Sequence, residues 1–283
     1  MAEIEVRGRV VWGEGMLAVG REPAGGSRVS VADIRSALAR TVFRYGWDIR
    51  SRSLPPARAV RPLLEDLPSG RFPLLDVGCG RFGLAAFLHG VSVVGTDTQA
   101  PEDAGRRFPF VRGSVTALPF RARSFPIVTC IDVLEHLPPE DRARAVEEIV
   151  RVADRAVLLA CPHGATARHC DELYRRALEE RGKILPEWLI EHQRQAYPTG
   201  SGLVELVEGA ARRVGRMGRI SLSYTEPARV CRLVRAAAVR SNPLYLALNL
   251  LLGTFFNAFQ TPGIDSSYRI MLVADISDPV PAS

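Results

Sequence analysis

The chain has 283 residues, of which 47% are hydrophobic and 24% charged, and this composition excludes an intrinsically disordered protein. The net charge of +6 and the pI of about 9.4 come from arginines, because Lys183 is the one lysine. The sequence contains no run of five like charges, so it gives no sign of the basic stripe that nucleic-acid-binding proteins use. Five cysteines without a Cys-x-x-Cys pair argue against a disulfide framework and a zinc knuckle.

Residues 1–52 are predicted to form a small extension made of a β-hairpin and a helix. Residues 3–20 alternate loosely between polar and apolar side chains around a glycine-containing turn, which is typical of a hairpin. Apolar residues between positions 34 and 45 follow helical spacing. The first nine residues contain no continuous apolar stretch, so no secretory signal is predicted and a cytoplasmic location is expected.

Residues 53–283 are predicted to form the main domain. A helix is expected from Pro55 to Leu67, because proline suits the first helical turn. From residue 72 onwards, short apolar strands alternate with amphipathic helices, which is typical of a parallel, doubly wound α/β sheet. The expected strands are residues 73–77, 91–96, 108–111, 125–131, 156–161, 219–224 and 268–274, with helices at 84–88 and 140–152.

A glycine-rich turn follows the first expected strand, in the sequence Leu75-Asp76-Val77-Gly78-Cys79-Gly80. Glycines let the backbone turn sharply and pass close to a ligand. Gly78, Gly80 and Gly83 also satisfy the Gly-x-Gly-x-x-Gly pattern of dinucleotide-binding folds, so the turn alone leaves both classes of ligand open. Asp76 favours a cationic ligand, because a carboxylate repels a pyrophosphate and attracts an ammonium or sulfonium group.

A second acid, Asp97, ends the next expected strand, 21 residues after Asp76. A carboxylate at this place can accept hydrogen bonds from both hydroxyls of a ribose, as it does in NAD-binding proteins. Asp97 therefore indicates a ligand that contains adenosine. A helix cap or turn is the alternative role for this residue.

Several motifs occur in a fixed order over about residues 72–162. They are Leu75–Gly80, Gly95–Asp97, Gly113–Val115, Leu118–Phe120, Ser124–Val128, Cys130 and Asp132–Leu137. In order and spacing they resemble the class I S-adenosylmethionine-dependent methyltransferases, particularly the broad bacterial group with small-molecule or lipid-linked acceptors. The resemblance implies a Rossmann-like, seven-stranded, mostly parallel sheet with an antiparallel last strand. Helical insertions are then expected at about residues 163–217 and 226–266.

The resemblance also implies S-adenosylmethionine as the methyl donor and assigns its contacts position by position. The implied donor-binding residues are Asp76, Gly78, Cys79 and Gly80 at the methionine end, Asp97 at the ribose, Thr98, Ser114 and Val115 around the adenine, and Cys130 and Ile131 through their backbones. No metal site is predicted.

Three residues depart from the pattern of that family. Phe82 stands where a third glycine is usual, although Gly83 follows it. Ser114 replaces an aspartate that commonly reads the adenine amino group, and Pro126 replaces an aspartate in the fourth strand. These departures affect the adenine side of the implied site more than the methionine side.

Two histidines are candidates for a general base that removes a proton from the acceptor. His163 directly follows the fifth expected strand, and His192 lies in a segment too long for a simple connection. A structural, hydrogen-bonded histidine is the alternative for each. Glu135 and His136 follow the fourth strand. Either they cap and pack the next helix, or they have a catalytic role.

Residues 241–264 contain no charged side chain, and their leucines and phenylalanines follow helical spacing. Interspersed asparagines argue against a membrane-spanning helix. Three roles remain open: packing on the chain's own domain, contact with a membrane surface or lipid substrate, and a dimer interface. For membrane contact, the flanking Arg232, Arg235 and Arg240 would face anionic lipid.

These observations predict methyl transfer to a small apolar or lipid-linked acceptor, by a protein that is cytoplasmic or peripheral at the inner face of the membrane. One alternative is a non-catalytic binding or scaffold protein with the same fold. A nucleic-acid methyltransferase is the second, although the basic residues are scattered. An NAD-dependent oxidoreductase lacks a supporting Ser/Tyr/Lys set.

Overall fold

The computed structural model describes residues 47–65, 67, 72–81, 83–100, 108–216, 219–240, 247, 251 and 263–277. All of them belong to the compact unit Arg40–Ser283. The hairpin expected at 3–20, the helix expected at 34–45 and Phe82 lie outside the described residues, as do most of residues 241–264. The division of the chain between residues 52 and 53 stays a prediction.

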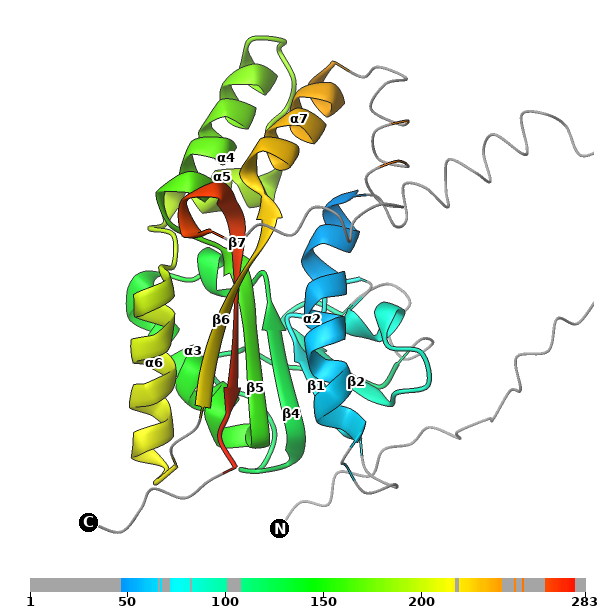
Figure 1. Cartoon of the computed structure of the whole chain (residues 1–283), viewed down its shortest axis with the longest axis vertical. Coiled ribbons are helices and arrows are strands. Elements are labelled where there is room, and N and C mark those ends of the chain that lie inside the picture. The colour runs from blue at the N-terminus through cyan, green and yellow to red at the C-terminus, as the bar shows by residue number, and fades with distance from the viewer. Residues whose placement is uncertain are drawn as a thin grey trace, which may run out of the picture. The chain divides into compact units, whose positions relative to one another are not determined.

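Seven strands form one sheet, in the order β3-β2-β1-β4-β5-β7-β6 (Figure 1). They are β1 (Leu74–Val77), β2 (Val93–Asp97), β3 (Phe110–Arg112), β4 (Phe125–Ile131), β5 (Ala153–Pro162), β6 (Arg219–Pro227) and β7 (Ser267–Asp275). Strand β7 runs antiparallel to both of its neighbours, β5 and β6, and the other four strand pairs described are parallel. The predicted α/β class, with a Rossmann-like, mostly parallel sheet and an antiparallel last strand, is confirmed.

Helices cover both faces of the sheet. They are α2 (Trp47–Glu65), η1 (Leu84–Phe87), η2 (Leu134–His136), α3 (Pro139–Val152), α4 (Gly164–Glu179), α5 (Glu187–Arg194), α6 (Gly200–Arg213), α7 (Ala228–Val239) and η4 (Ile264–Ser266). In β5, Val157 and Leu159 join the core under α3 and α6, whereas Leu158 and Ala160 join the core under α2 and η1. This period of two, with apolar residues on both faces, is what a strand buried on both sides requires.

Helix α2 begins at Trp47 and continues through Pro55 and Pro56, so the expected start at Pro55 is wrong. Trp47 is 1% exposed, and its indole Nε1 donates a hydrogen bond to Glu226 Oε1 at 3.2 Å. Burial of this large side chain favours helix before the prolines, because tertiary packing outweighs the local preference of proline for a first turn.

Three helices form a cap beyond the carboxyl ends of the parallel strands. Helices α4 and α7 pack on each other, and α5 contacts both α4 and η2 (Figure 1). The cap helices come from the segments in which insertions are expected. The third helix of the first segment, α6, instead packs on α3 against the sheet. The cap therefore stands at the edge of the sheet where ligands bind in such folds.

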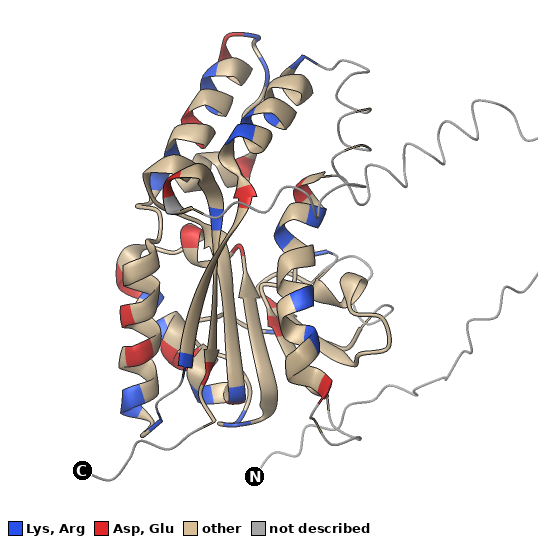
Figure 2. Cartoon of the chain, in the orientation of Figure 1, with Lys and Arg blue, Asp and Glu red and all other residues tan. Residues whose placement is uncertain are grey.

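Acidic and basic side chains are mixed on α4 and α6 (Figure 2). On α4, for example, Arg175 pairs with Glu172 at 2.7 Å and with Glu179 at 2.6 Å. Such mixing does not give these helices the single-sign stripe that nucleic-acid binding uses. No helix among the described residues is long and apolar enough to cross a bilayer.

All five cysteines of the chain are buried and free of disulfide bonds. Burial raises the pKa of each thiol, and for Cys130 and Cys161 the nearby Glu135 carboxylate adds to this effect. The thiols are therefore protonated at neutral pH and behave as small apolar side chains.

Candidate functional site

A cavity of about 650 Å³ opens at the carboxyl ends of β1, β2 and β4. The residues that line it are Val77, Gly78, Gly80, Arg81, Thr96, Asp97, Thr98, Gln99, Ala100, Gly113, Ser114, Val115, Asp132, Val133, His136, Leu137 and Glu191. Ligands of doubly wound sheets bind at this edge, where the strand order switches direction. Here the switch lies between β1 and β4, whose loops meet in the cavity wall.

The glycine turn after β1 forms one wall of the cavity. Gly78 and Gly80 have φ of 70° and 51°, a left-handed backbone that favours glycine. The Gly78 N–H donates to the Thr96 carbonyl at 2.8 Å, which ties the turn to β2. A Cβ atom added at Gly78 would overlap the Val133 side chain. Glycine is therefore required here both by backbone conformation and by close packing.

Asp76 lies beneath this turn and does not line the cavity. Its carboxylate accepts hydrogen bonds from the Leu84 N–H at 2.6 Å and from the Thr129 hydroxyl at 2.9 Å. Burial raises the pKa of Asp76 to about 6, although the two hydrogen bonds oppose the rise. In this position Asp76 holds the turn and the start of η1 in place.

Asp97 ends β2 and lies on the cavity wall. Its Oδ2 accepts a hydrogen bond from the Gly80 N–H at 3.0 Å, and its Oδ1 accepts from the Gln99 N–H at 3.3 Å. These backbone donors fix the carboxylate between the glycine turn and the loop after β2. A carboxylate oxygen has more than one lone pair, so Asp97 keeps capacity for the hydroxyls of a ribose.

The cavity brings together six of the predicted donor-binding residues: Gly78, Gly80, Asp97, Thr98, Ser114 and Val115. The other four, Asp76, Cys79, Cys130 and Ile131, do not line it, and their contact with the donor stays a prediction. Sequence reasoning named Gly113 only as part of a motif, and it did not name Gln99 and Ala100, which follow shortly after Asp97. It gave no signal that Glu191, from α5, reaches the same wall.

A buried ion-pair network supports the loop after β4. Asp132 lines the cavity with a φ of 55°, and its carboxylate pairs with the Arg269 guanidinium. Arg269 Nε also donates to Glu226 Oε2 at 2.6 Å, which in turn accepts the bond from Trp47. The network connects α2, β6 and β7 to the cavity wall.

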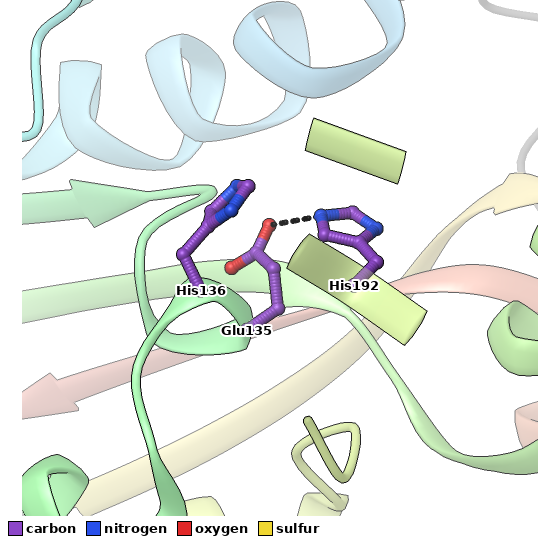
Figure 3. Close-up of side chains that lie close together, drawn as sticks. All are labelled: Glu135, His136 and His192. Atoms are coloured by element: carbon purple, nitrogen blue, oxygen red, sulfur yellow. Dashed lines mark ion pairs between the residues drawn. The ribbon is translucent and has the colours of Figure 1, made fainter. Parts of the chain in front are cut away.

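Glu135, His136 and His192 lie close together beside the cavity (Figure 3). Figure 3 shows the Glu135 carboxylate turned towards His192, whose Nε2 is 3.9 Å from Glu135 Oε1. Glu135 and His192 are buried, and His136 lines the cavity. Burial, with the nearby Asp132 charge, raises the pKa of Glu135, and burial, with the nearby His192, lowers the pKa of His136.

The two histidines named as candidate bases do not line the cavity. His192 is 4% exposed, and its Nδ1 bonds to Asp171 Oδ2 at 2.8 Å. His163 is also 4% exposed and precedes α4, and burial lowers its pKa. A role for either as general base stays a prediction.

Residues 75–161 match the family model described as a methyltransferase domain. The chain carries a methyltransferase domain. The matched residues run from β1 to β5 and supply every cavity-lining residue except Glu191. The prediction of a methyltransferase is thus confirmed, while the subgroup with lipid-linked acceptors is not.

Two methyltransferases are among the solved structures with a similar fold. The phosphoethanolamine N-methyltransferase 2 of Haemonchus contortus, in complex with S-adenosyl-L-methionine, has a TM-score of 0.50 and 14% identity, over 88% of this chain and 59% of that one. Magnesium protoporphyrin IX methyltransferase from Synechocystis PCC 6803, with bound SAH, has a TM-score of 0.44 and 17% identity, over 89% of this chain and 90% of that one. None of the curated proteins matches the sequence.

Proposed function

We propose that this methyltransferase domain transfers a methyl group from S-adenosylmethionine to a small acceptor, apolar or lipid-linked, bound in the same cavity. The observation that carries the proposal is the placement of Asp97 beside the glycine turn, in one wall of a cavity of about 650 Å³. A volume of this size is within the range of about 300–1,000 Å³ for small-molecule sites.

The donor end of the cavity is formed by the loops after β1, β2 and β3. The Asp97 carboxylate accepts hydrogen bonds from the ribose hydroxyls. Gly78 and Gly80 have no side chains, so the methionine part of the donor can lie against the backbone. Ser114 and Val115 border the adenine. Ser114 replaces the usual aspartate as a neutral neighbour of the base. Its hydroxyl is hydrogen-bonded to the Thr116 hydroxyl at 2.9 Å.

The acceptor end is formed by the loop after β4 and by α5. Methyl transfer is an in-line displacement, in which the acceptor atom bonds to the methyl carbon as the carbon–sulfur bond breaks. The protein therefore has to align the acceptor and exclude water. Val133 and Leu137 offer apolar contacts there, while His136 and Glu191 offer polar ones.

The uncharged segment 241–264 supports an apolar or lipid-linked acceptor, although most of it lies outside the described residues. One part of the membrane-contact hypothesis changes. The Arg235 side chain is turned inward to the buried Asp171 carboxylate, so it does not face anionic lipid. Arg232 and Arg240 are exposed and keep that role as a prediction.

A thermal-shift experiment tests the donor. The purified protein is melted with S-adenosylmethionine, S-adenosylhomocysteine and NAD in parallel, because a ligand that binds the native state raises the melting temperature. We expect a rise with both adenosyl compounds and none with NAD. No rise with either adenosyl compound would favour the non-catalytic alternative. Release of S-adenosylhomocysteine with a panel of apolar acceptors then tests the acceptor class.

A further inference from the structure

The cluster of Glu135, His136 and His192 combines one carboxylate and two imidazoles from two separate elements. Glu135 and His136 belong to η2, directly after β4, and His192 belongs to α5. One ligand atom from each lies within 4.8 Å of the other two. Ligands at about 2.0–2.2 Å from a shared zinc-like ion are up to about 4 Å apart, so small side-chain rotations suffice to close this set on an ion.

The burial of the Glu135 carboxylate is compensated only in part, by the more distant charges of Arg269 and Arg52. Glu135 is 2% exposed, and neither of its side-chain oxygens has a hydrogen-bond partner among the described residues. Its nearest basic atom, His192 Nε2, is 3.9 Å away, beyond hydrogen-bonding distance. A buried unpaired carboxylate is costly, and a cation between Glu135 and the imidazoles removes that cost.

Each histidine is already oriented by a second carboxylate. His192 Nδ1 bonds to Asp171 Oδ2 at 2.8 Å, and His136 Nδ1 bonds to Glu191 Oε2 at 2.6 Å. A carboxylate acceptor fixes the proton on Nδ1 of a neutral imidazole and leaves Nε2 unprotonated for a metal. Asp171 is itself held by Arg235 and by the Tyr268 hydroxyl at 2.8 Å, so the His192 ring is rigidly placed.

We propose that Glu135, His136 and His192 bind one divalent transition-metal ion, of the zinc type, in the wall of the cavity. Imidazole nitrogen with one carboxylate suits such ions better than magnesium or calcium, which prefer oxygen ligands. Three protein ligands leave a coordination position open. Because His136 lines the cavity, the open position faces the acceptor end.

This site specifies the acceptor, and in that respect it rests on the proposed function. A zinc-type ion binds a hydroxyl oxygen and lowers its pKa, so the acceptor class is an alcohol, phenol or enol. The hydroxyl proton passes to solvent, the oxygen bonds to the methyl carbon, and the electron pair of the broken carbon–sulfur bond stays on sulfur. The products are a methyl ether and S-adenosylhomocysteine.

Titration with Co²⁺ tests the metal site without any acceptor. Untagged protein is treated with EDTA, dialysed and titrated with Co²⁺, and the visible absorption of the bound ion is recorded. We expect one equivalent to bind, and Zn²⁺ to displace it. Glu135→Gln and His136→Gln should each weaken Co²⁺ binding at least tenfold. His169→Asn, at an exposed histidine of α4, should leave it unchanged.

Two results would overturn the metal site: wild-type protein that binds no Co²⁺, or a folded Glu135→Gln/His136→Gln double variant that binds Co²⁺ as tightly as wild type. Circular dichroism establishes that each variant is folded. The thermal shift with S-adenosylhomocysteine separates the two proposals. Donor binding without Co²⁺ binding removes the metal alone, whereas Co²⁺ binding without donor binding keeps the metal and removes the proposed methyl transfer.

Discussion

Gly78 and Val133 pack against each other in the wall of the cavity, and the Val133 Cγ2 methyl fills the space that a side chain at position 78 would need. The first residue belongs to the turn after β1 and the second to the loop after β4. The two loops between which the strand order switches direction are thus interlocked. The shape of the cavity wall depends on this contact.

Gly78→Ala is expected to destabilise the protein by about 2–4 kcal/mol. About 1–2 kcal/mol arises because alanine disfavours a φ of 70°, and the rest arises from overpacking against Val133. Adding Val133→Ala to Gly78→Ala should recover the overpacking part but not the backbone part. Urea unfolding of both single variants and the double variant measures this coupling. Strictly additive losses would contradict the interlock.

Asp97→Ala should weaken the binding of S-adenosylhomocysteine by at least about 100-fold. Each hydrogen bond to a charged acceptor contributes about 1.5–3 kcal/mol, and the variant loses those to the ribose. Isothermal titration calorimetry gives the affinity. Glu205→Ala, at an exposed acid of α6, is the matched control and should bind as wild type does. An unchanged affinity in Asp97→Ala would count against the donor site.

The raised pKa of Asp76, about 6 against an ordinary 3.8, predicts a stability change with pH. Folding favours the protonated form of this carboxyl, so its contribution is fully present below pH 4 and is lost as the pH rises through 6. Asp76→Asn stays neutral. Its amide oxygen can accept from the Leu84 N–H, and its amide nitrogen can donate to the Thr129 hydroxyl.

Between pH 4.5 and pH 7, wild type should therefore lose about 2 kcal/mol relative to Asp76→Asn, which is most of the effect of two pKa units at 1.36 kcal/mol each. Urea unfolding of both proteins at pH 4.5, 5.5 and 7 measures the difference. If the gap between the two proteins stays constant over this range, the environment assigned to Asp76 is wrong.

Arg269→Met should cost about 3–5 kcal/mol, because it leaves the buried Glu226 carboxylate without its cation. It should also weaken S-adenosylhomocysteine binding, since Asp132 in the cavity wall loses the same partner. Adding Glu226→Gln should restore part of the stability but not the affinity. Thermal unfolding with and without S-adenosylhomocysteine distinguishes the two effects. Recovery of both by the double variant would show that Asp132 does not need Arg269.

The sheet and the donor end of the cavity could be predicted because their signals are local. A run such as Val157–Leu159 carries the apolar pattern of a strand buried on both faces. The glycines of the turn and Asp97 at the end of β2 occur at fixed distances from such runs. Parallel strands bring their carboxyl ends to one edge, so these residues had to meet.

The packing of the cap and the cluster of Glu135, His136 and His192 could not be predicted, because both depend on contacts between residues far apart in the sequence. His192 was singled out as a base, yet its partners Glu135 and Asp171 are 57 and 21 residues away. The buried Asp171 bonds to His192 and so helps to decide which face of α5 packs on η2. No residue spacing in the sequence predicts this orientation. The start of α2 was missed for the same reason, since Trp47 is fixed by Glu226 from β6.

The five buried, protonated thiols are not expected to react with thiol-specific labels, so a single added cysteine can be labelled selectively. A maleimide reagent needs an accessible thiolate, and none of these five cysteines offers one. Glu187→Cys, at the exposed first residue of α5, would then be the one position to take a fluorescent or spin label. A probe placed there reports on the helix that carries Glu191 and His192, and it needs no cysteine-free variant as a starting point.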